Sequence, residues 1–162
     1  MCWDKLLKIK TSGRDDSRAN TYNYPYEPTP YEVLDRLANS GLITKKDVLL
    51  DYGSGKGRVE FFFSWQVRCH TIGIEYEVNR CFFFNPFSVE VLQIAMARIL
   101  ESWYEDPREI LLFFYYPSDE YISWLMTVDE LSFFDEIDCG DLFAGHDGRE
   151  RVMIFQLEGT NK

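Results

Sequence analysis

Residues 48–75 constrain the fold of this chain more than any other stretch. The apolar run Val48–Leu50 leads into Asp51 and Tyr52, glycines follow at positions 53, 55 and 57, and a second apolar run covers Val59–Trp65. This pattern predicts a strand, a tight loop and a helix. Glycine permits positive φ and close approach of a ligand to the backbone, and the amino end of the following helix presents free N–H groups. We therefore expect a phosphate or nucleoside site at the carboxyl end of the strand.

The spacing of the glycines narrows the kind of ligand. A nucleoside triphosphate loop has the pattern Gly-x-x-x-x-Gly-Lys-Ser/Thr, whereas Lys56 lies between two glycines and no hydroxyl follows it. A dinucleotide fingerprint, Gly-x-Gly-x-x-Gly, is one residue longer than the spacing here. A second acid, Glu75, closes the next apolar stretch, where dinucleotide-binding proteins hold ribose hydroxyls with a carboxylate.

The run Asp51-x-Gly-x-Gly-x-Gly57 with Glu75 resembles the first motifs of class I S-adenosylmethionine-dependent methyltransferases. The segment Glu27-Pro-Thr-Pro30 resembles one that borders the methionine end of the cofactor in a subgroup of these enzymes. The resemblance implies an α/β fold with a Rossmann-like, mainly parallel sheet and a C-terminal antiparallel hairpin. It also implies S-adenosylmethionine as cofactor, bound by Thr29, Asp51, Gly53, Gly55, Gly57 and Glu75.

A second motif, Asn85-Pro86-Phe87, follows the apolar run 82–84. It resembles the Asn-Pro step that faces the transferable methyl group in this family, which implies a catalytic role for Asn85, Pro86 and Phe87. There an amide oxygen and a backbone carbonyl orient the target amine, and the aromatic ring packs on the acceptor. The second proline of the fuller Asn-Pro-Pro-aromatic form is absent, and an ordinary strand-ending turn is the alternative interpretation.

The remaining elements follow from periodicity and turn residues. Residues 1–23 are expected to form a mobile arm, because Lys8–Asn23 is polar without apolar periodicity, and residues 24–162 a single domain. Thr29 is expected to cap a helix that runs up to Gly41, and Ser88–Tyr104 and Asp119–Met126 are predicted helices. Glu109–Tyr116 has the composition of a buried parallel strand, and Leu131–Cys139 and Arg151–Glu158 that of an antiparallel pair. Tyr115–Pro117 is a candidate pocket lining, and His146 is interpreted as a solvated loop residue.

The connection between the second and third predicted strands, 70–76 and 82–85, is too short for the resembled fold. That fold places a helix, a strand and a further helix here, on the order of thirty residues for each unit, whereas only 77–81 lie between these strands. A link of this length does not close the ordinary topology. Three interpretations remain open: a segment is missing from the chain, the two strands form an antiparallel hairpin, or a second chain supplies one half. Loss of the segment would uncover apolar surface, with self-association through the sheet edge beside 70–76 as one outcome.

Composition limits partners and location. Lys and Arg number 17 against 27 Asp and Glu, a net charge of −10, which disfavours nucleic acid and anionic lipid. No apolar run approaches the ~20 residues of a membrane span, so a cytoplasmic, soluble protein is expected. The scattered cysteines give no zinc pattern, and no metal site is predicted. We expect methyl transfer to an amine nitrogen of a basic protein or a small molecule; the alternative is a catalytically inactive binding or regulatory module.

Overall fold

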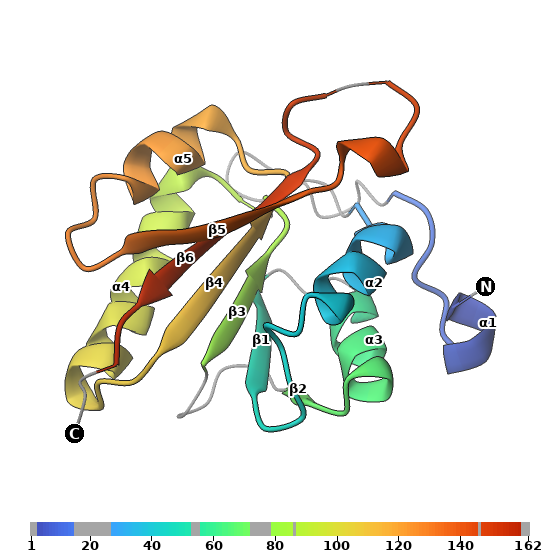
Figure 1. Cartoon of the computed structure of the whole chain (residues 1–162), viewed down its shortest axis with the longest axis horizontal. Coiled ribbons are helices and arrows are strands. Elements are labelled where there is room, and N and C mark those ends of the chain that lie inside the picture. Colours follow the sequence, from blue (N-terminus) through green and yellow to red (C-terminus); the bar gives the residue numbers. More distant parts are fainter. Residues whose placement is uncertain are drawn as a thin grey trace.

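The computed structural model of the chain describes residues 3–14, 27–52, 56–71, 79–85, 87–145 and 147–159. Six strands form one sheet in the order β2-β1-β3-β4-β6-β5 (Figure 1). The parallel strands are β1 (Val48–Tyr52), β2 (His70–Thr71), β3 (Arg80–Phe83) and β4 (Ile110–Tyr115). β6 (Arg151–Leu157) is antiparallel to both β4 and β5 (Ser132–Asp138). The α/β class, the mainly parallel sheet and the C-terminal antiparallel pair are confirmed.

Helices cover both faces of the sheet. α2 (Tyr31–Asn39) and α3 (Arg58–Gln66) pack on one face, and α4 (Val89–Glu105) and α5 (Asp119–Leu125) pack on the other (Figure 1). Val33, Leu34 and Leu37 of α2 recur at helical spacing and are fully buried. The expectation that Thr29 caps this helix is wrong, because Pro30 occupies the N-cap position with an extended ψ of 138° and helical geometry starts only at Tyr31.

Aromatic side chains tie the strands together on the α4–α5 face. Tyr52, Phe83 and Phe114 are register neighbours on β1, β3 and β4. Their rings stack, with centroids 4.8 Å apart in the first pair and 4.6 Å apart in the second. Phe155 of β6 meets Phe114 edge-on, and Phe133 of β5 meets Phe155 in the same way. Each such pair contributes about 0.5–1.5 kcal/mol beyond its burial, so these ring contacts stabilise the register between the strands.

The placement of β2 and β3 was not predicted from the sequence. β2 and β3 lie on opposite sides of β1 and both run parallel to it, so the antiparallel hairpin is wrong. Thr71 and Arg80 both pair with Leu49, one from each side, which puts them about 10 Å apart, or two strand spacings. Residues 72–79 reach roughly 27 Å when extended. This reach is enough to join Thr71 to Arg80, so β2 and β3 can lie on opposite sides of β1 with a connection of this length.

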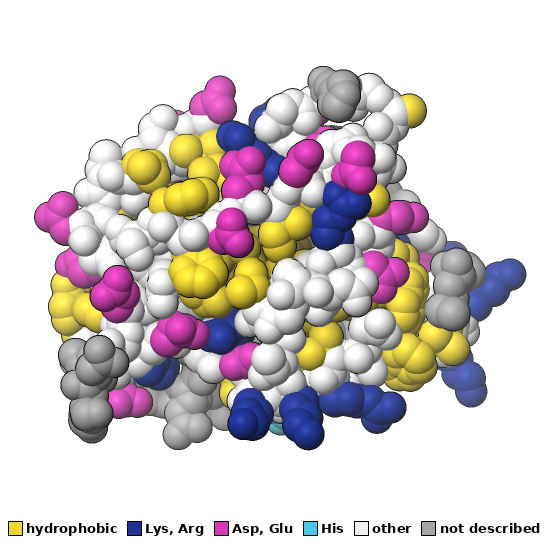
Figure 2. Space-filling model, viewed as in Figure 1, with side chains coloured by type: hydrophobic (Ala, Val, Ile, Leu, Met, Phe, Trp, Pro, Cys, Tyr) yellow, Lys and Arg dark blue, Asp and Glu magenta, His cyan; other side chains and the backbone are white. Residues whose placement is uncertain are grey.

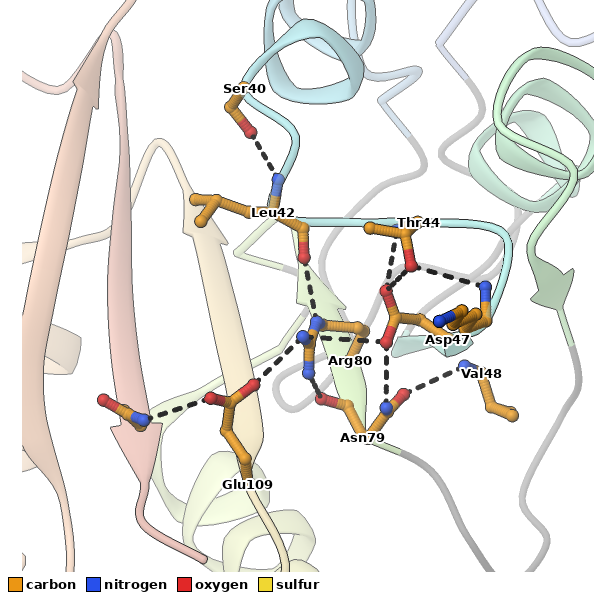
Figure 3. A network of polar contacts seen from close by, with 10 residues as sticks. Ser40, Leu42, Thr44, Asp47, Val48, Asn79, Arg80 and Glu109 are labelled. Atoms are coloured by element: carbon orange, nitrogen blue, oxygen red, sulfur yellow. Dashed lines mark hydrogen bonds and ion pairs between the residues drawn. The ribbon is translucent and has the colours of Figure 1, made fainter.

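A polar cluster at the amino ends of the strands holds β3 against β1 (Figure 3). Asn79 donates from Nδ2 to Asp47 Oδ1 (3.0 Å) and accepts the Val48 amide at Oδ1 (2.9 Å). Arg80 is only 9% exposed; its Nη2 lies 3.0 Å from a Glu109 carboxylate oxygen and 3.6 Å from Asp47 Oδ1. No role was predicted for Asn79 or Arg80 from the sequence. The sequence feature that could have indicated their role is a pair of polar residues directly before an apolar run.

The beginning of the predicted mobile arm is packed onto the domain, which corrects that expectation for residues 3–14. α1 (Trp3–Leu7) places the Trp3 ring edge-on against Phe62 of α3, with centroids 4.8 Å apart. Trp3 is 6% exposed and Thr11 is 1% exposed, so both belong to the interior. Residues 15–26 lie outside the described part of the chain.

Three further expectations concern membranes, metals and thiols. In the described part of the chain, no helix is long and apolar enough to cross a membrane. No three His, Cys, Asp or Glu side chains of the described residues form a group that could hold a metal ion. Cys69, Cys81 and Cys139 are free thiols in the interior. Burial raises the pKa of the Cys81 thiol to about 12, so it acts as a small apolar side chain.

Candidate functional site at the carboxyl ends of the parallel strands

The carboxyl ends of β1, β3 and β4 meet at one edge of the sheet, where ligands of α/β proteins usually bind. Asp51 and Tyr52 end β1, and their register partners on β3 are Phe82 and Phe83. One strand further, Phe83 pairs with Phe114 of β4. The glycine loop follows β1, and the residues 84–88 and 116–118 follow β3 and β4, so all three loops leave the sheet at the same edge.

Asn85 and Tyr116 occupy equivalent positions at this edge. Each lies two residues beyond a register pair formed by Phe83 on β3 and Phe114 on β4. Each has a left-handed backbone, with φ of 37° and 52° respectively, and each is followed by a proline. For residues other than glycine such conformations cost of order 1–3 kcal/mol and cluster at ligand-binding sites. Of the four described residues other than glycine with positive φ, two thus lie where neighbouring strands end; the other two are Lys8 and Arg68.

Asn85 also carries a buried amide oxygen that lacks a partner. Its Oδ1 atom is shielded from solvent and accepts no hydrogen bond from any described residue. A buried acceptor without a donor costs about 1–3 kcal/mol, and native structures rarely leave one without a reason. The geometry fits an oxygen that receives a donor from a ligand.

Of the two other residues of this motif, the structure describes Phe87. Phe87 is 8% exposed, and its ring meets Phe83 edge-on at 6.5 Å. The backbone carbonyl of Phe87 accepts the Tyr121 hydroxyl at 2.6 Å. Most of the Phe87 ring is thus packed in the core, next to Phe83. Pro86 lies outside the described residues.

The glycine loop is described only at its end. Gly57 has φ of 75°, and a Cβ atom placed on it would lie 3.1 Å from the Phe61 ring, so a glycine is required before α3. Asp51 is half-buried at the end of β1; burial first, and then the nearby Glu60 carboxylate, raises its pKa well above the ordinary value of 3.8. Two neighbouring acids of this kind favour a cationic ligand group. The predicted cofactor residues Gly53, Gly55 and Glu75 lie outside the described residues.

Thr29 lies next to the start of α3. It is 4% exposed, and its backbone carbonyl accepts a hydrogen bond from Arg58 Nη1 at 2.9 Å. Arg58 directly follows Gly57, so the segment ahead of the glycine motif and the end of the glycine loop are in direct contact. The Arg58 side chain thus links Thr29 to the residue that follows Gly57.

The connection between β5 and β6 is tied to the end of β4. Tyr116 donates its hydroxyl proton to Asp147, and the Arg149 guanidinium lies 4.5 Å above the Tyr116 ring. Tyr115 donates to a Glu150 carboxylate oxygen at 2.8 Å. These bonds were not predicted from the sequence, which indicated Tyr115–Pro117 only as a possible lining. His146 lies outside the described residues.

Charged side chains of both signs lie over the face of the molecule shown in Figure 2. Several Lys and Arg side chains gather along the lower margin, near the amino end of β1 in Figure 1, and acidic and basic side chains are interspersed over the middle and upper part. At the candidate site Arg149 lies over the Tyr116 ring and pairs with Asp147, so this edge carries charges of both signs.

Comparison with known proteins adds no family to this description. No protein-family model matches the chain, and no curated protein matches its sequence. The chemistry of the site is therefore inferred from its own residues.

Proposed function

We propose that the chain is a Rossmann-like S-adenosylmethionine-dependent methyltransferase that transfers a methyl group to an amine nitrogen. The observation that carries the proposal is Asn85: a strained residue at the end of a parallel strand next to β1, with a buried amide oxygen and no donor among the described residues. An amine N–H is a donor of the kind this oxygen lacks.

The residues at the glycine loop fit the proposed cofactor. S-adenosylmethionine supplies an electrophilic methyl group on a sulfonium centre and carries an ammonium group besides. A cationic group bound here would favour the charged form of Asp51, whose pKa burial and the Glu60 carboxylate raise, and Gly57 allows the backbone to turn close to the ligand before α3. Thr29, in contact with Arg58, borders the same loop. Gly53, Gly55 and Glu75 complete the proposed cofactor site by their resemblance to the family motif.

The contribution of Asn85 is to orient the acceptor. Its Oδ1 atom accepts one amine hydrogen, which directs the nitrogen lone pair at the methyl carbon. The amine must be neutral at that moment, because an ammonium nitrogen has no lone pair to form the new C–N bond. In the proposed reaction the methyl–sulfur bond would break as this bond forms, S-adenosylhomocysteine would leave, and the methylated ammonium product would lose its extra proton to solvent. Tyr116, at the equivalent position on β4, supports the neighbouring side of the acceptor.

The acceptor class proposed is a basic protein side chain or a small amine. The net charge of −10 attracts cations and repels nucleic-acid phosphates. The absence of a second proline after Asn85 also distinguishes this motif from the fuller form in nucleobase-modifying relatives.

Transfer of a labelled methyl group tests this proposal. The purified chain is incubated with methyl-labelled S-adenosylmethionine and cell extract, and the label is sought in protein, nucleic acid and small molecules. We expect label in protein or in small amines, reduced at least a hundredfold by Asn85→Ala and unchanged by Arg98→Ala, a substitution on the exposed face of α4. Label only in nucleic acid would contradict the acceptor class, and Asn85→Ala activity equal to wild type would contradict the role of Asn85.

A second candidate is a binding module that holds the cofactor without turnover. It is favoured by the interval 72–79, which is too short for the helix, strand and helix that the resembled enzymes have between the corresponding strands. Saturable cofactor binding with no transfer of label to any component of the extract would support this module over the enzyme.

A further inference from the structure

A buried arginine connects three separate segments directly behind the glycine loop. Arg58, the first residue of α3, is 8% exposed. Its Nε atom donates to Thr11 Oγ1 at 2.8 Å, and its Nη1 atom donates to the Thr29 carbonyl at 2.9 Å. The guanidinium lies 4.3 Å from the centroid of the Tyr31 ring. One side chain therefore joins the amino-terminal segment, the segment ahead of α2 and the start of α3.

Asp4 completes this arrangement from α1. One of its carboxylate oxygens lies 3.9 Å from Arg58 Nη2 and accepts the hydroxyls of Thr11 (2.7 Å) and Tyr31 (2.5 Å). The other oxygen accepts the Thr11 and Ser12 amides at 3.1 and 3.2 Å. Trp3, the residue before Asp4, packs against Phe62 of α3. Residues 3–12 are thus anchored on the helix that begins at the glycine loop.

We propose that Arg58 is a positioning residue for the cofactor site, and that residues 3–12 act through it on cofactor affinity. The proposal rests on the proposed function, because Thr29 and Gly57 are its candidate cofactor contacts. The planar fork of arginine fixes the Thr29 carbonyl and the Thr11 hydroxyl at a defined separation, which a lysine ammonium on a flexible stem does not do. The first turn of α3 carries the N–H groups aimed at the ligand, so a shift of Arg58 changes their direction.

The expected consequence is a loss of binding that exceeds the loss of fold. Arg58→Lys keeps the charge beside Asp4 but loses the fork. Thr11→Val removes the acceptor of Arg58 Nε in a segment that has no predicted cofactor contact. Each variant is expected to weaken cofactor binding by about tenfold or more, the equivalent of one lost charged hydrogen bond. The matched control is Arg98→Lys on the exposed face of α4, where the side chain is 74% exposed.

Two measurements on the full chain test the proposal. The first is the Kd of S-adenosylhomocysteine by calorimetry, at a temperature at which each variant is shown to be folded. The second is hydrogen exchange of the amides in the first turn of α3, including the Phe61 amide, which bonds to the Gly57 carbonyl at 3.0 Å. We expect both variants to raise the Kd and to speed exchange there, while exchange in β4 stays at the wild-type rate.

The outcomes separate this proposal from the proposed function. If wild type binds and both variants bind equally well, the positioning role is wrong while the cofactor site stands. If wild type shows no binding, the proposed function fails, and hydrogen exchange alone tests whether Arg58 positions the first turn of α3. Unchanged exchange in that turn in both variants overturns the positioning role. Faster exchange confined to that turn supports the positioning role. Faster exchange throughout the sheet would show a purely structural role for Arg58 and would also overturn the proposal.

Discussion

Replacement of Arg80 by leucine tests how a chain with so short a link holds β3 beside β1. Arg80 Nε donates to the Leu42 carbonyl (2.9 Å) and Nη1 donates to the Asn79 carbonyl (2.8 Å). Nη2 bonds to Glu109 and lies near Asp47, whose side chain is only 9% exposed. Glu109 is 51% exposed and contributes little, because exposed ion pairs are screened by solvent. The main loss is therefore at Asp47 and the two carbonyls.

The size of this effect follows from what stays buried after the substitution. Removal of one partner of a buried ion pair costs about 3–5 kcal/mol. Asp47 keeps its bonds from the Thr44 amide and hydroxyl and from Asn79 Nδ2, so the lower end of that range is expected. We predict that Arg80→Leu lowers the free energy of unfolding by about 3 kcal/mol.

Urea unfolding followed by tryptophan fluorescence measures this loss. Arg98→Leu is the control, since that side chain is 74% exposed and paired only with Glu101 one turn along α4; it should change stability by less than about 0.5 kcal/mol. A decrease below about 1 kcal/mol for Arg80→Leu, with an unchanged m value, would show that the cluster does not hold β3 and would refute the reasoning.

Three other substitutions give separate expectations. Burial raises the pKa of Asp4, but hydrogen bonds from Tyr31 and Thr11 and the charge of Arg58 outweigh it and lower the pKa from 3.8 to about 2. The charged Asp4 carboxylate therefore stabilises the fold by about 2 kcal/mol above pH 4, and this stabilisation is lost as the pH falls from about 4 to about 2. In urea titrations, Asp4→Asn should unfold more easily than wild type at pH 7 and equally at pH 2. Asn85→Gly should raise the unfolding free energy by about 1 kcal/mol or more, because relief of the positive φ and removal of the unpaired amide oxygen outweigh the added freedom of the unfolded chain, yet abolish methyl transfer; a fully active variant would contradict the role of its amide. Gly57→Ala should destabilise the fold by about 1–2 kcal/mol in the same assay, since φ is 75° and the new Cβ lies 3.1 Å from Phe61; a neutral result would show that the loop relaxes freely.

The parts of the fold that were predictable from the sequence depend on local patterns. β1 and the start of α3 follow from an apolar run, glycine spacing and a second apolar run, all within residues 48–66. The C-terminal strands follow from a connection that contains no predicted helix, which requires antiparallel pairing. Asn85 was predicted as a site residue because its motif is contiguous.

The parts that were not predictable depend on distant partners. Arg80 bonds to Leu42, which lies 38 positions earlier, and no local pattern indicates that pairing. Of the predicted strand 70–76, His70 and Thr71 pair with β1, and 72–76 lie outside the described residues. The positive φ of Tyr116 is a property of the strand end and not of tyrosine itself. The packing of Trp3 was hidden because a single aromatic residue carries no periodicity.

The exposed aromatic surface also bears on the predicted self-association. On α3, Phe61 is 50% exposed and Trp65 is 44% exposed, whereas the neighbouring Phe62 and Phe63 are fully buried. In the described part of the chain, one side of α3 is thus apolar and accessible, which is the kind of surface that self-association would use. Sedimentation of the purified chain over a range of concentrations measures whether this surface pairs with a second copy.

Titration of the purified chain with S-adenosylmethionine in a calorimeter tests the central claim most directly. The account predicts a saturable heat with one site per chain, weakened at least tenfold by Gly57→Val, whose side chain would meet Phe61 and require a strained backbone. The Arg98→Lys chain should bind as wild type does. No heat at millimolar cofactor, from a chain shown to be folded by a cooperative urea transition, would contradict the account.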